Sequence, residues 1–416
     1  MATTAPHEAQ VHQVLATLGY GDAIGNEVLG IQKVLRRAGY ESRIYVQTAE
    51  PRVENLTTDY RDLLEESHPD NILIHHFSIG SRASRVAYAL ADRMILVYHN
   101  ITPPEYFIGV NRTLVELCYE GRRELRAYAQ RCDLALGDSE FNRAELEQMG
   151  FPRTGILPVV PGFDHLDVTP NRILASAFDD GWTNILFVGR MIPNKCIEDL
   201  VRFFHTYRLR YNSTSRLLLV GSQSGFEDYL ALVSDLIVRL NTPDVHFIGH
   251  VSNEELTALY DVADLFLSAS EHEGFCVPLV EAFRKQIPVV AFAATAVPST
   301  MDGGGVLYNY KDARHVAALI HAVLSDQVLE AEILRAQDAA LDRLLRANFD
   351  QTLLGFVDQV RRARRLPHPD VARDFWDQFE RADELEELRE YRPSAYQALP
   401  KKPRIGGQRS GTKEGP

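Results

Sequence analysis

Cysteine is rare in this chain of 416 residues, and long apolar runs are missing. The four cysteines are too few and too irregularly spaced to suggest a zinc site, a redox pair or a disulfide framework. No run reaches the roughly 18 apolar residues that a membrane-spanning helix needs. The formal net charge of −13 argues against bulk binding of nucleic acid. The composition, with 45% hydrophobic and 24% charged residues, is that of an ordinary globular protein.

The first residues of the sequence carry no targeting pattern. They lack the positively charged start and the apolar core of a secretory signal. Together with the low cysteine content, this leads us to expect a cytoplasmic protein.

Short apolar runs bounded by glycine or polar residues recur along the chain and predict strands. The first unit is a strand at Val11–Leu18, a glycine loop at 19–26, a helix from about Glu27 to Ala38 and a strand at 42–46. Further strands are expected at 71–77, 94–100, 133–139 and 155–160, after residues 184, 216 and 245, and at 265–267, 288–292 and 306–308. From residue 312 to about 390 the pattern is helical. The length and the alternation predict two α/β domains.

The stretch from Ser268 to Ala282 combines a strand end, a glycine loop and a helix start. Glu273 lies on the loop, and Glu281 falls just inside a helix that Pro278 is suited to begin. Amide groups at a helix N-terminus bind anions, and two carboxylates can accept hydrogen bonds from several hydroxyls. A nucleotide sugar carries both kinds of group. The alternative is a loop with two solvated glutamates.

The spacing Glu273-x7-Glu281 resembles the paired-glutamate motif of retaining glycosyltransferases of family 4, which have the GT-B fold. The resemblance implies two Rossmann-like domains facing across a cleft. It implies an acceptor-side domain at 1–170, a nucleotide-sugar donor domain at 180–350 and helices at 351–395 that return to the first domain. Residues 400–416, rich in Gly, Lys and Arg, are expected to form a disordered tail.

A second motif follows the strand that begins at residue 184. Arg190 and Lys195 stand five residues apart after a glycine turn, and two such cations suit a diphosphate. Two solvated loop cations are the alternative. The stretch resembles the glycine-arginine…lysine motif of the same family. The chain departs from the family pattern at two positions, with Cys196 in place of glycine and Ser299 in place of glutamate. The first change allows a different shape for the loop after Lys195, and the second allows weaker contacts to the donor sugar.

The resemblance assigns roles to individual residues. Arg190 and Lys195 would stabilise the leaving diphosphate, and Glu273 would hold hydroxyls of the donor sugar. Glu281 would hold the ribose, and His99, at a strand end, would lie beside the sugar ring rather than serve the fold alone. The remaining donor-binding candidates are Gly21, Asp22, Gly189, Gly221, Val251, Gly274, Phe275, Cys276 and Val277, and Arg143 is a weaker acceptor-side candidate.

The predicted activity is transfer of a hexose-type sugar from a nucleotide-sugar donor to an acceptor hydroxyl with retained configuration. UDP is favoured over GDP by family frequency, and no metal or cofactor is expected. The acceptor is left open among a sugar, a lipid-linked sugar and a small molecule. A nucleotide-sugar epimerase, a non-catalytic nucleotide-sugar-binding protein and, less favoured, a pyridoxal-phosphate-dependent phosphorolytic enzyme are the alternatives.

The residues from Leu114 to Arg131 have a helical pattern and include four arginines, Arg122, Arg123, Arg126 and Arg131. One interpretation is an ordinary solvated face. The other is a basic surface that meets an anionic acceptor or anionic lipid. The second interpretation predicts peripheral contact with the inner face of the membrane.

Overall fold

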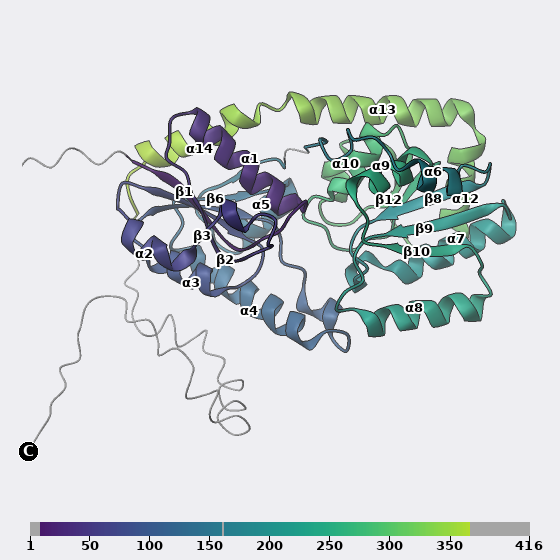
Figure 1. Ribbon diagram of the computed structural model, residues 1–416, viewed down its shortest axis with the longest axis horizontal. Coiled ribbons are helices and arrows are strands. Elements are labelled where there is room, and N and C mark those ends of the chain that lie inside the picture. Colours follow the sequence, from purple (N-terminus) through teal and green to yellow (C-terminus); the bar gives the residue numbers. More distant parts are fainter. Residues whose placement is uncertain (1–8, 160–161, 367–416) are drawn as a thin grey trace, which may run out of the picture. The chain divides into compact units, whose positions relative to one another are not determined.

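The computed structural model describes residues 9–159 and 162–366, and its strands form two parallel sheets (Figure 1). The first sheet contains β1 (Val11–Leu18), β2 (Ile44–Ala49), β3 (Thr58–Asp59), β4 (Ile72–Phe77), β5 (Arg93–Tyr98), β6 (Leu134–Gly137) and β7 (Thr154–Ile156). The second contains β8 (Thr183–Val188), β9 (Ser215–Val220), β10 (Val245–Gly249), β11 (Leu265–Ser268), β12 (Val289–Phe292) and β13 (Val306–Tyr308). Two Rossmann-like α/β halves, the predicted fold class, are therefore confirmed.

The strand order of each sheet reverses once. The first sheet has the order β3-β2-β1-β4-β5-β6-β7 and the second β10-β9-β8-β11-β12-β13. In open α/β sheets, ligands bind beyond the carboxyl ends of the strands where the order reverses. The reversals lie between β1 and β4 and between β8 and β11, so the loops after these strands are the expected ligand-binding loops.

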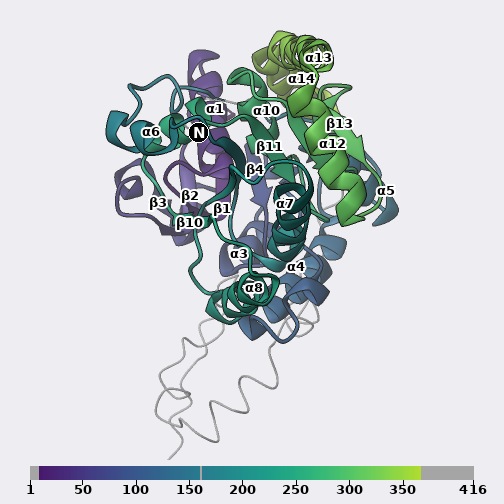
Figure 2. The ribbon, with the colours of Figure 1, turned by 90° about the vertical axis from the view of Figure 1, so that its right-hand side faces the viewer.

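Helices connect the strands and cover the sheets. In the first half they are α1 (Ala23–Arg37), α2 (Leu63–Glu66), α3 (Arg82–Ala89), α4 (Arg112–Tyr128) and α5 (Glu140–Gln148). In the second they are α6 (Arg172–Phe178), α7 (Ile197–Arg210), α8 (Glu227–Leu240), α9 (Asn253–Asp261), α10 (Val277–Arg284), α11 (Val297–Met301), α12 (Ala313–Ser325) and α13 (Gln327–Arg346). Figure 1 shows α9 and α10 above the second sheet and α8 below it, and α7 packs against α12 (Figure 2).

The last described helix, α14 (Phe349–Arg362), packs on the first half although it follows the second in sequence. Leu353, Val357 and Val360 are buried in the same apolar cluster as Val11 of β1 and Ile31 of α1. Contacts between α14 and both α1 and β5 accompany this burial. The expected helices beyond residue 366 and the expected tail at 400–416 lie outside the described residues.

Several predicted boundaries were wrong, for local reasons. The first helix begins at Ala23 rather than near Glu27, because Asp22 already caps it by accepting a hydrogen bond from an amide of the first turn. The loop after β5 contains a short 3-10 helix at Pro104–Phe107, an element that the strand pattern does not indicate. The expected basic helix ends at Tyr128, and Arg131 is buried beyond it, where its guanidinium donates to three backbone carbonyls.

None of the helices in the described ranges is both long and apolar enough to cross a membrane.

Candidate active site

The glycine loops after β8 and β9 pack directly on each other. A Cβ on Gly221 would lie 2.0 Å from the carbonyl oxygen of Gly189, and the φ of Gly221 is +141°. The Gly221 amide also donates to the carbonyl of Gly249 at 2.8 Å. No side chain fits between these loops, so both glycines are structural requirements. Arg190, which directly follows Gly189, is exposed to solvent.

Lys195 and Glu273 form an ion pair within the second half. Their side chains are 17% and 8% exposed. Burial alone would lower the pKa of Lys195, but the Glu273 carboxylate raises it above its ordinary value. The adjacent Asn194 fixes the two segments together, since its side chain donates to the carbonyl of His272 at 3.0 Å.

Cys196 follows the lysine in the left-handed conformation, with φ 52° and ψ 54°. Glycine adopts this conformation without strain, whereas other residues do so at a cost of roughly 1–2 kcal/mol. The departure from the expected glycine has therefore kept a backbone conformation that glycine favours. The short 3-10 helix at Pro193–Lys195 ends there, and α7 begins at the next residue.

Arg190 is a second cation near Lys195, because its charge opposes the raised pKa of Lys195. Its guanidinium carbon lies 5.7 Å from the ring centre of Phe226, within the range of a cation–π contact. Among the described residues, no hydrogen-bond or ion-pair partner is found for this guanidinium. Arg190 is thus a cation held over a ring and open to an anionic ligand.

The loop before α10 is held from one side and keeps its amide groups free. The Glu273 amide donates to Thr295 Oγ1 at 2.8 Å, and Thr300 Oγ1 donates to the Phe275 carbonyl at 2.5 Å. Cys276 caps α10 with φ 76°, and its side chain makes no capping hydrogen bond to the helix. The Phe275 and Cys276 amides donate no hydrogen bond among the described residues. Unused amides at a helix N-terminus are an anion site, and Val277 is the first residue of that helix.

Glu281 is the fifth residue of α10 and is 6% exposed. Its two oxygens are oriented by different groups: His165 Nε2 lies 2.7 Å from Oε1, and the Tyr260 hydroxyl donates to Oε2 at 2.7 Å. The bond to Glu281 raises the pKa of His165. Neither partner was identified from the sequence, because they lie 116 and 21 residues away.

Gly274 lies where the loops of the two halves meet. A Cβ at this position would be 2.9 Å from Asn100 Cβ, 3.0 Å from the His99 carbonyl oxygen and 3.4 Å from Asn142 Nδ2. The requirement for glycine is therefore one of space. The structure brings the backbone of His99, rather than its ring, to the loop that carries Glu273.

The His99 ring is engaged inside the first half by a chain of side chains. The Gln13 amide nitrogen donates to the Val28 carbonyl at 3.1 Å, so the Gln13 oxygen faces His76 Nε2 at 2.9 Å. His76 Nε2 must then donate, and His76 Nδ1 accepts from His99 Nε2 at 2.9 Å. His99 Nδ1 lies 3.0 Å from Asp138 Oδ2. Both ring nitrogens of His99 therefore carry protons.

The pKa values agree with this assignment. Burial would lower the pKa of His99, but Asp138, with help from Glu27 and Asp22, raises it to about 9. Burial and the charge of Asp138 raise the pKa of Glu27 to about 8. His76 stays neutral, because burial and then His99 hold its pKa well below the ordinary value. The cluster is a buried imidazolium beside two carboxyl groups, of which Glu27 holds a proton at neutral pH.

Four further positions were predicted from the sequence: Gly21, Asp22, Val251 and Arg143. Gly21, with φ 73°, and Asp22 form the turn that starts α1, and the charge of Asp22 reaches His99. Val251 is half-buried against the core of the second half. The guanidinium of Arg143 pairs with Glu140 and Glu147 on its own helix, and a role toward the acceptor stays a prediction.

Two clusters of described residues have the spacing of metal ligands. One is Glu27, His99 and Asp138, and the other is Cys196, Asp199 and Glu271. In each cluster a cationic side chain of the protein lies against the carboxylates. In the first cluster it is His99, and in the second it is Lys311, whose Nζ lies 3.0 Å from Asp199 and 2.8 Å from Glu271. Independence from metal remains a prediction.

Sequence reasoning missed Asp138, His76 and Gln13. A signal was present, because Asp138 directly follows the strand end of β6, and β4, β5 and β6 are neighbours in the sheet. Thr295 and Thr300 had no sequence signal, because hydroxyls that hold a loop are common in any turn.

Residues 183–326 match the family model described as Glycosyl transferases group 1. The chain is 25% identical over 244 residues to O-antigen chain mannosyltransferase B of Escherichia coli, covering 56% of this chain and 62% of that protein. It is 32% identical over 186 residues to D-inositol 3-phosphate glycosyltransferase of Corynebacterium kroppenstedtii, covering 42% and 40%. The chain thus matches less than two thirds of the length of either relative.

The fold is shared with solved structures at low identity. HepE from Anabaena, in complex with UDP and glucose, superposes with a TM-score of 0.65 at 17% identity, covering 85% of this chain and 100% of that chain. The comparisons confirm the predicted GT-B architecture and the predicted kinship with glycosyltransferases. They do not test the individual site residues.

The close approach at Gly274 predicts a cost for added volume. Gly274→Ala should lower the free energy of unfolding by about 1–3 kcal/mol, because the new methyl must displace Asn100 or the His99 carbonyl. Gly30→Ala, in the middle of α1 with nothing within 4 Å, is the matched control and should stabilise by about 0.5–1 kcal/mol. Urea unfolding measures both. A Gly274→Ala protein as stable as the parent would contradict the close approach.

The buried cluster predicts a pH dependence of stability. Glu27 and His99 have folded pKa values of about 8 and about 9, above ordinary values of 4.5 and 6.5. The folded state therefore binds more protons, and stability should fall as pH rises from about 5 through 9, with up to about 1.4 kcal/mol per pH unit for each proton. Glu27→Gln should flatten this fall, as urea unfolding between pH 6 and 9 would show. Equal slopes for both proteins would contradict the assignment.

Proposed function

We propose that this chain, which through residues 183–326 belongs to the group 1 glycosyl transferases, transfers a hexose-type sugar from a nucleotide-sugar donor to an acceptor hydroxyl. The anomeric configuration is retained, and no metal takes part. The observation that carries the proposal is the Lys195–Glu273 pair, set beside Arg190 and the free amides at the start of α10. This set offers cations and amides to a diphosphate and a carboxylate to sugar hydroxyls.

In the proposed step, the bond between the sugar C1 and the diphosphate oxygen breaks, and a bond from C1 to the acceptor oxygen forms on the same face. The acceptor proton passes to the leaving diphosphate, so no protein nucleophile is needed. Negative charge grows on the diphosphate as it leaves, where Lys195, Arg190 and the amides of Phe275 and Cys276 stabilise it. Fixed donors aimed at developing charge are usually the largest single contribution to such a rate.

Lys195 and Glu273 neutralise each other's charge before the donor binds. Lys195 and Glu273 satisfy each other without donor, which avoids leaving a buried charge unpaired. When donor binds, the diphosphate takes the lysine and sugar hydroxyls take the carboxylate. Glu281, already oriented by His165 and Tyr260, keeps lone pairs for the ribose hydroxyls.

His99 acts in this proposal through its backbone and its charge. Both ring nitrogens are engaged by His76 and Asp138, so the carbonyl is the group that faces the loop of Gly274. This changes the role expected from the sequence, in which His99 lies beside the sugar ring. The imidazolium adds a positive charge at the strand end nearest the sugar.

We propose UDP rather than GDP as the nucleotide of the donor. The superposed HepE structure contains UDP and glucose, whereas the first-named relative is a mannosyltransferase. Glucose and mannose are both hexoses, so both comparisons support a hexose-type donor. The base itself is expected to be held largely by backbone groups near Val251, which leave little trace in side chains.

Nucleotide binding is the first test. Purified protein is heated with UDP, GDP or ADP, each at about 100 times a plausible dissociation constant, which should stabilise it by about 2.7 kcal/mol. We expect a shift with UDP that exceeds the other two. A shift with GDP alone would overturn the choice of base, and no shift with any nucleotide would count against the donor site.

Kinetics of two variants separate chemistry from binding. Lys195→Ala should lower kcat by about 10²–10³, because a donor to the leaving group is lost. Glu281→Ala should mainly raise KM for the donor. Lys285→Ala, which breaks the Lys285–Asp261 pair at 2.8 Å beyond the end of α10, is the matched control and should retain activity. All assays are repeated in excess EDTA, where activity should persist.

Full-rate turnover by Lys195→Ala would reject the assignment of the leaving-group cation. Conversion of the donor to another sugar nucleotide without any acceptor would instead identify an epimerase, the main alternative.

A further inference from the structure

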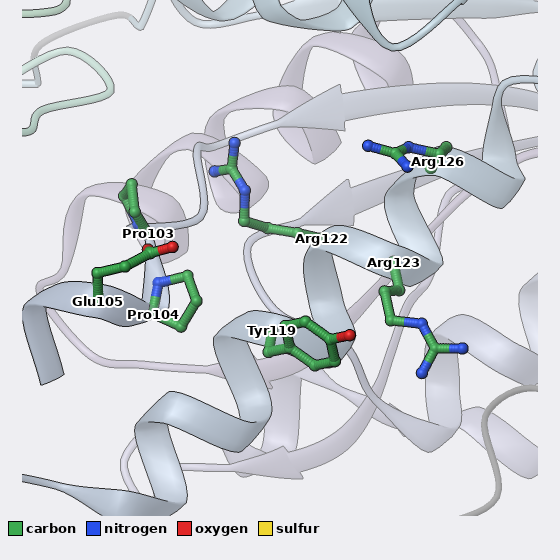
Figure 3. A pocket seen from close by; sticks show the side chains of 7 residues that line it. All are labelled: Pro103, Pro104, Glu105, Tyr119, Arg122, Arg123 and Arg126. Carbon is green, nitrogen blue, oxygen red and sulfur yellow. The ribbon is translucent and has the colours of Figure 1, made fainter. Parts of the chain in front are cut away.

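A basic pocket of about 480 Å³ opens beside α4 in the first half (Figure 3). Its described lining consists of Pro103, Pro104, Glu105, Tyr119, Arg122, Arg123 and Arg126. The volume lies within the range of small-molecule sites. Pro103 and the 3-10 helix that begins at Pro104 form one stiff wall, and the C-terminal part of α4 forms the other. The proposed donor residues do not line this pocket.

Arg122 is locked in place before any ligand binds. Its Nη1 donates to the Ile101 carbonyl at 2.6 Å, and its Nη2 pairs with Glu145. The Tyr98 hydroxyl donates to the other oxygen of Glu145 at 2.9 Å, which fixes that carboxylate. A guanidinium anchored in this way loses little freedom when it binds a further acceptor group.

Arg126 lies one turn further along the same face of α4. Figure 3 shows its guanidinium on the same side of the helix as that of Arg122, whereas Arg123 extends to the other side. Arg126 is exposed, and within the described ranges no partner is found for its guanidinium. Arg123 lies with its guanidinium carbon 5.8 Å from the Tyr119 ring centre. Arg122 and Arg126 are therefore the two cations that can close on one ligand.

We propose that this pocket binds a phosphate group carried by the acceptor, with Arg122 and Arg126 as its ligands. The proposal rests on the proposed function. The planar guanidinium fork of Arg126 matches a phosphate with two parallel hydrogen bonds, and Arg122 adds its positive charge and the N–H groups that Ile101 and Glu145 leave unused. The phosphate belongs either to a soluble sugar phosphate or to a lipid headgroup.

The position of the pocket suits an acceptor. Tyr106, next to the pocket wall, donates to Glu271 at 3.3 Å, and its ring centre lies 6.3 Å from that of His272. His272 directly precedes Glu273, and the charge of Arg122 helps to lower the pKa of His272, after burial, to about 4. A molecule held by phosphate in the pocket would thus have its other end near the donor sugar.

Three features oppose an anion here and are outweighed. Glu105 carries a carboxylate in the described lining, but it is exposed and free to turn to water. Glu145 already neutralises one positive charge at Arg122. The carbonyl end of α4 also repels anions weakly, by about 0.3–1 kcal/mol. Arg126 has no partner among the described residues, and the exposed Glu105 is free to turn away, so a phosphate meets positively charged side chains.

The test uses inorganic phosphate as the probe, measured by calorimetry at low salt with saturating UDP to block the diphosphate site. Saturable phosphate binding is expected for the full-length protein. Arg126→Gln should weaken it about tenfold or more, as the loss of a charge-assisted hydrogen bond does. Arg112→Gln, at the start of α4 and roughly 20 Å away along the helix, removes the same charge and should bind phosphate like the parent.

Two results overturn the proposal: no saturable binding of phosphate, or equal weakening by Arg126→Gln and Arg112→Gln. If UDP itself does not bind, the donor site fails, and the phosphate titration of the three proteins without UDP still decides whether the pocket binds phosphate. The two failures are therefore distinguishable.

The source of the phosphate is decided by two further measurements. If mannose 6-phosphate competes with inorganic phosphate for the parent protein, and competes less well for Arg126→Gln, the acceptor is a soluble sugar phosphate. Sedimentation with phosphatidylcholine vesicles containing phosphatidic acid, reduced by Arg126→Gln but not by Arg112→Gln, assigns a lipid headgroup. Loss of both responses would contradict an acceptor phosphate in this pocket.

Discussion

The contact between Gly274 and the end of β5 is the constraint on which the site depends. A glycine without a Cβ lets the loop of Glu273 approach the His99 carbonyl and Asn100 within van der Waals distance. On its other side the loop is tied to Thr295 and Thr300. The loop therefore has little freedom in either direction, and the direction in which its amides and Glu273 point follows from these contacts.

Most charges of the site are paired internally before any ligand binds. His99 pairs with Asp138 and Lys195 with Glu273, and Glu281 is hydrogen-bonded to His165 and Tyr260. Buried charges need such partners, because an uncompensated buried charge costs several kcal/mol. A ligand therefore exchanges partners with the protein rather than meeting bare charges. Arg190, exposed and stacked on Phe226, is the exception and is free to meet an incoming anion first.

The sequence predicted the parts that are local and failed where topology decides. The strand at Val11–Leu18 was predicted to the residue, and Lys195 and Glu273 were selected by spacing that is short in sequence. That these two would pair was not predicted, although both belong to the second half. The chain from Gln13 through His76 and His99 to Asp138 spans four neighbouring strands, β1, β4, β5 and β6, and their order cannot be read from apolar runs. The orientation of the His99 ring depends on this order.

The arginines of α4 show why counting charges is a poor guide to a binding surface. Four arginines between residues 122 and 131 suggested one basic face. Arg131 lies past the helix end and is satisfied by backbone carbonyls, and Arg123 extends away from Arg122. The helical spacing of four residues leaves Arg122 and Arg126 together, and only the loop after β5 turns that pair into a pocket. The shape of the proposed acceptor pocket thus depends on a loop–helix contact, Arg122 to Ile101, that no motif encodes.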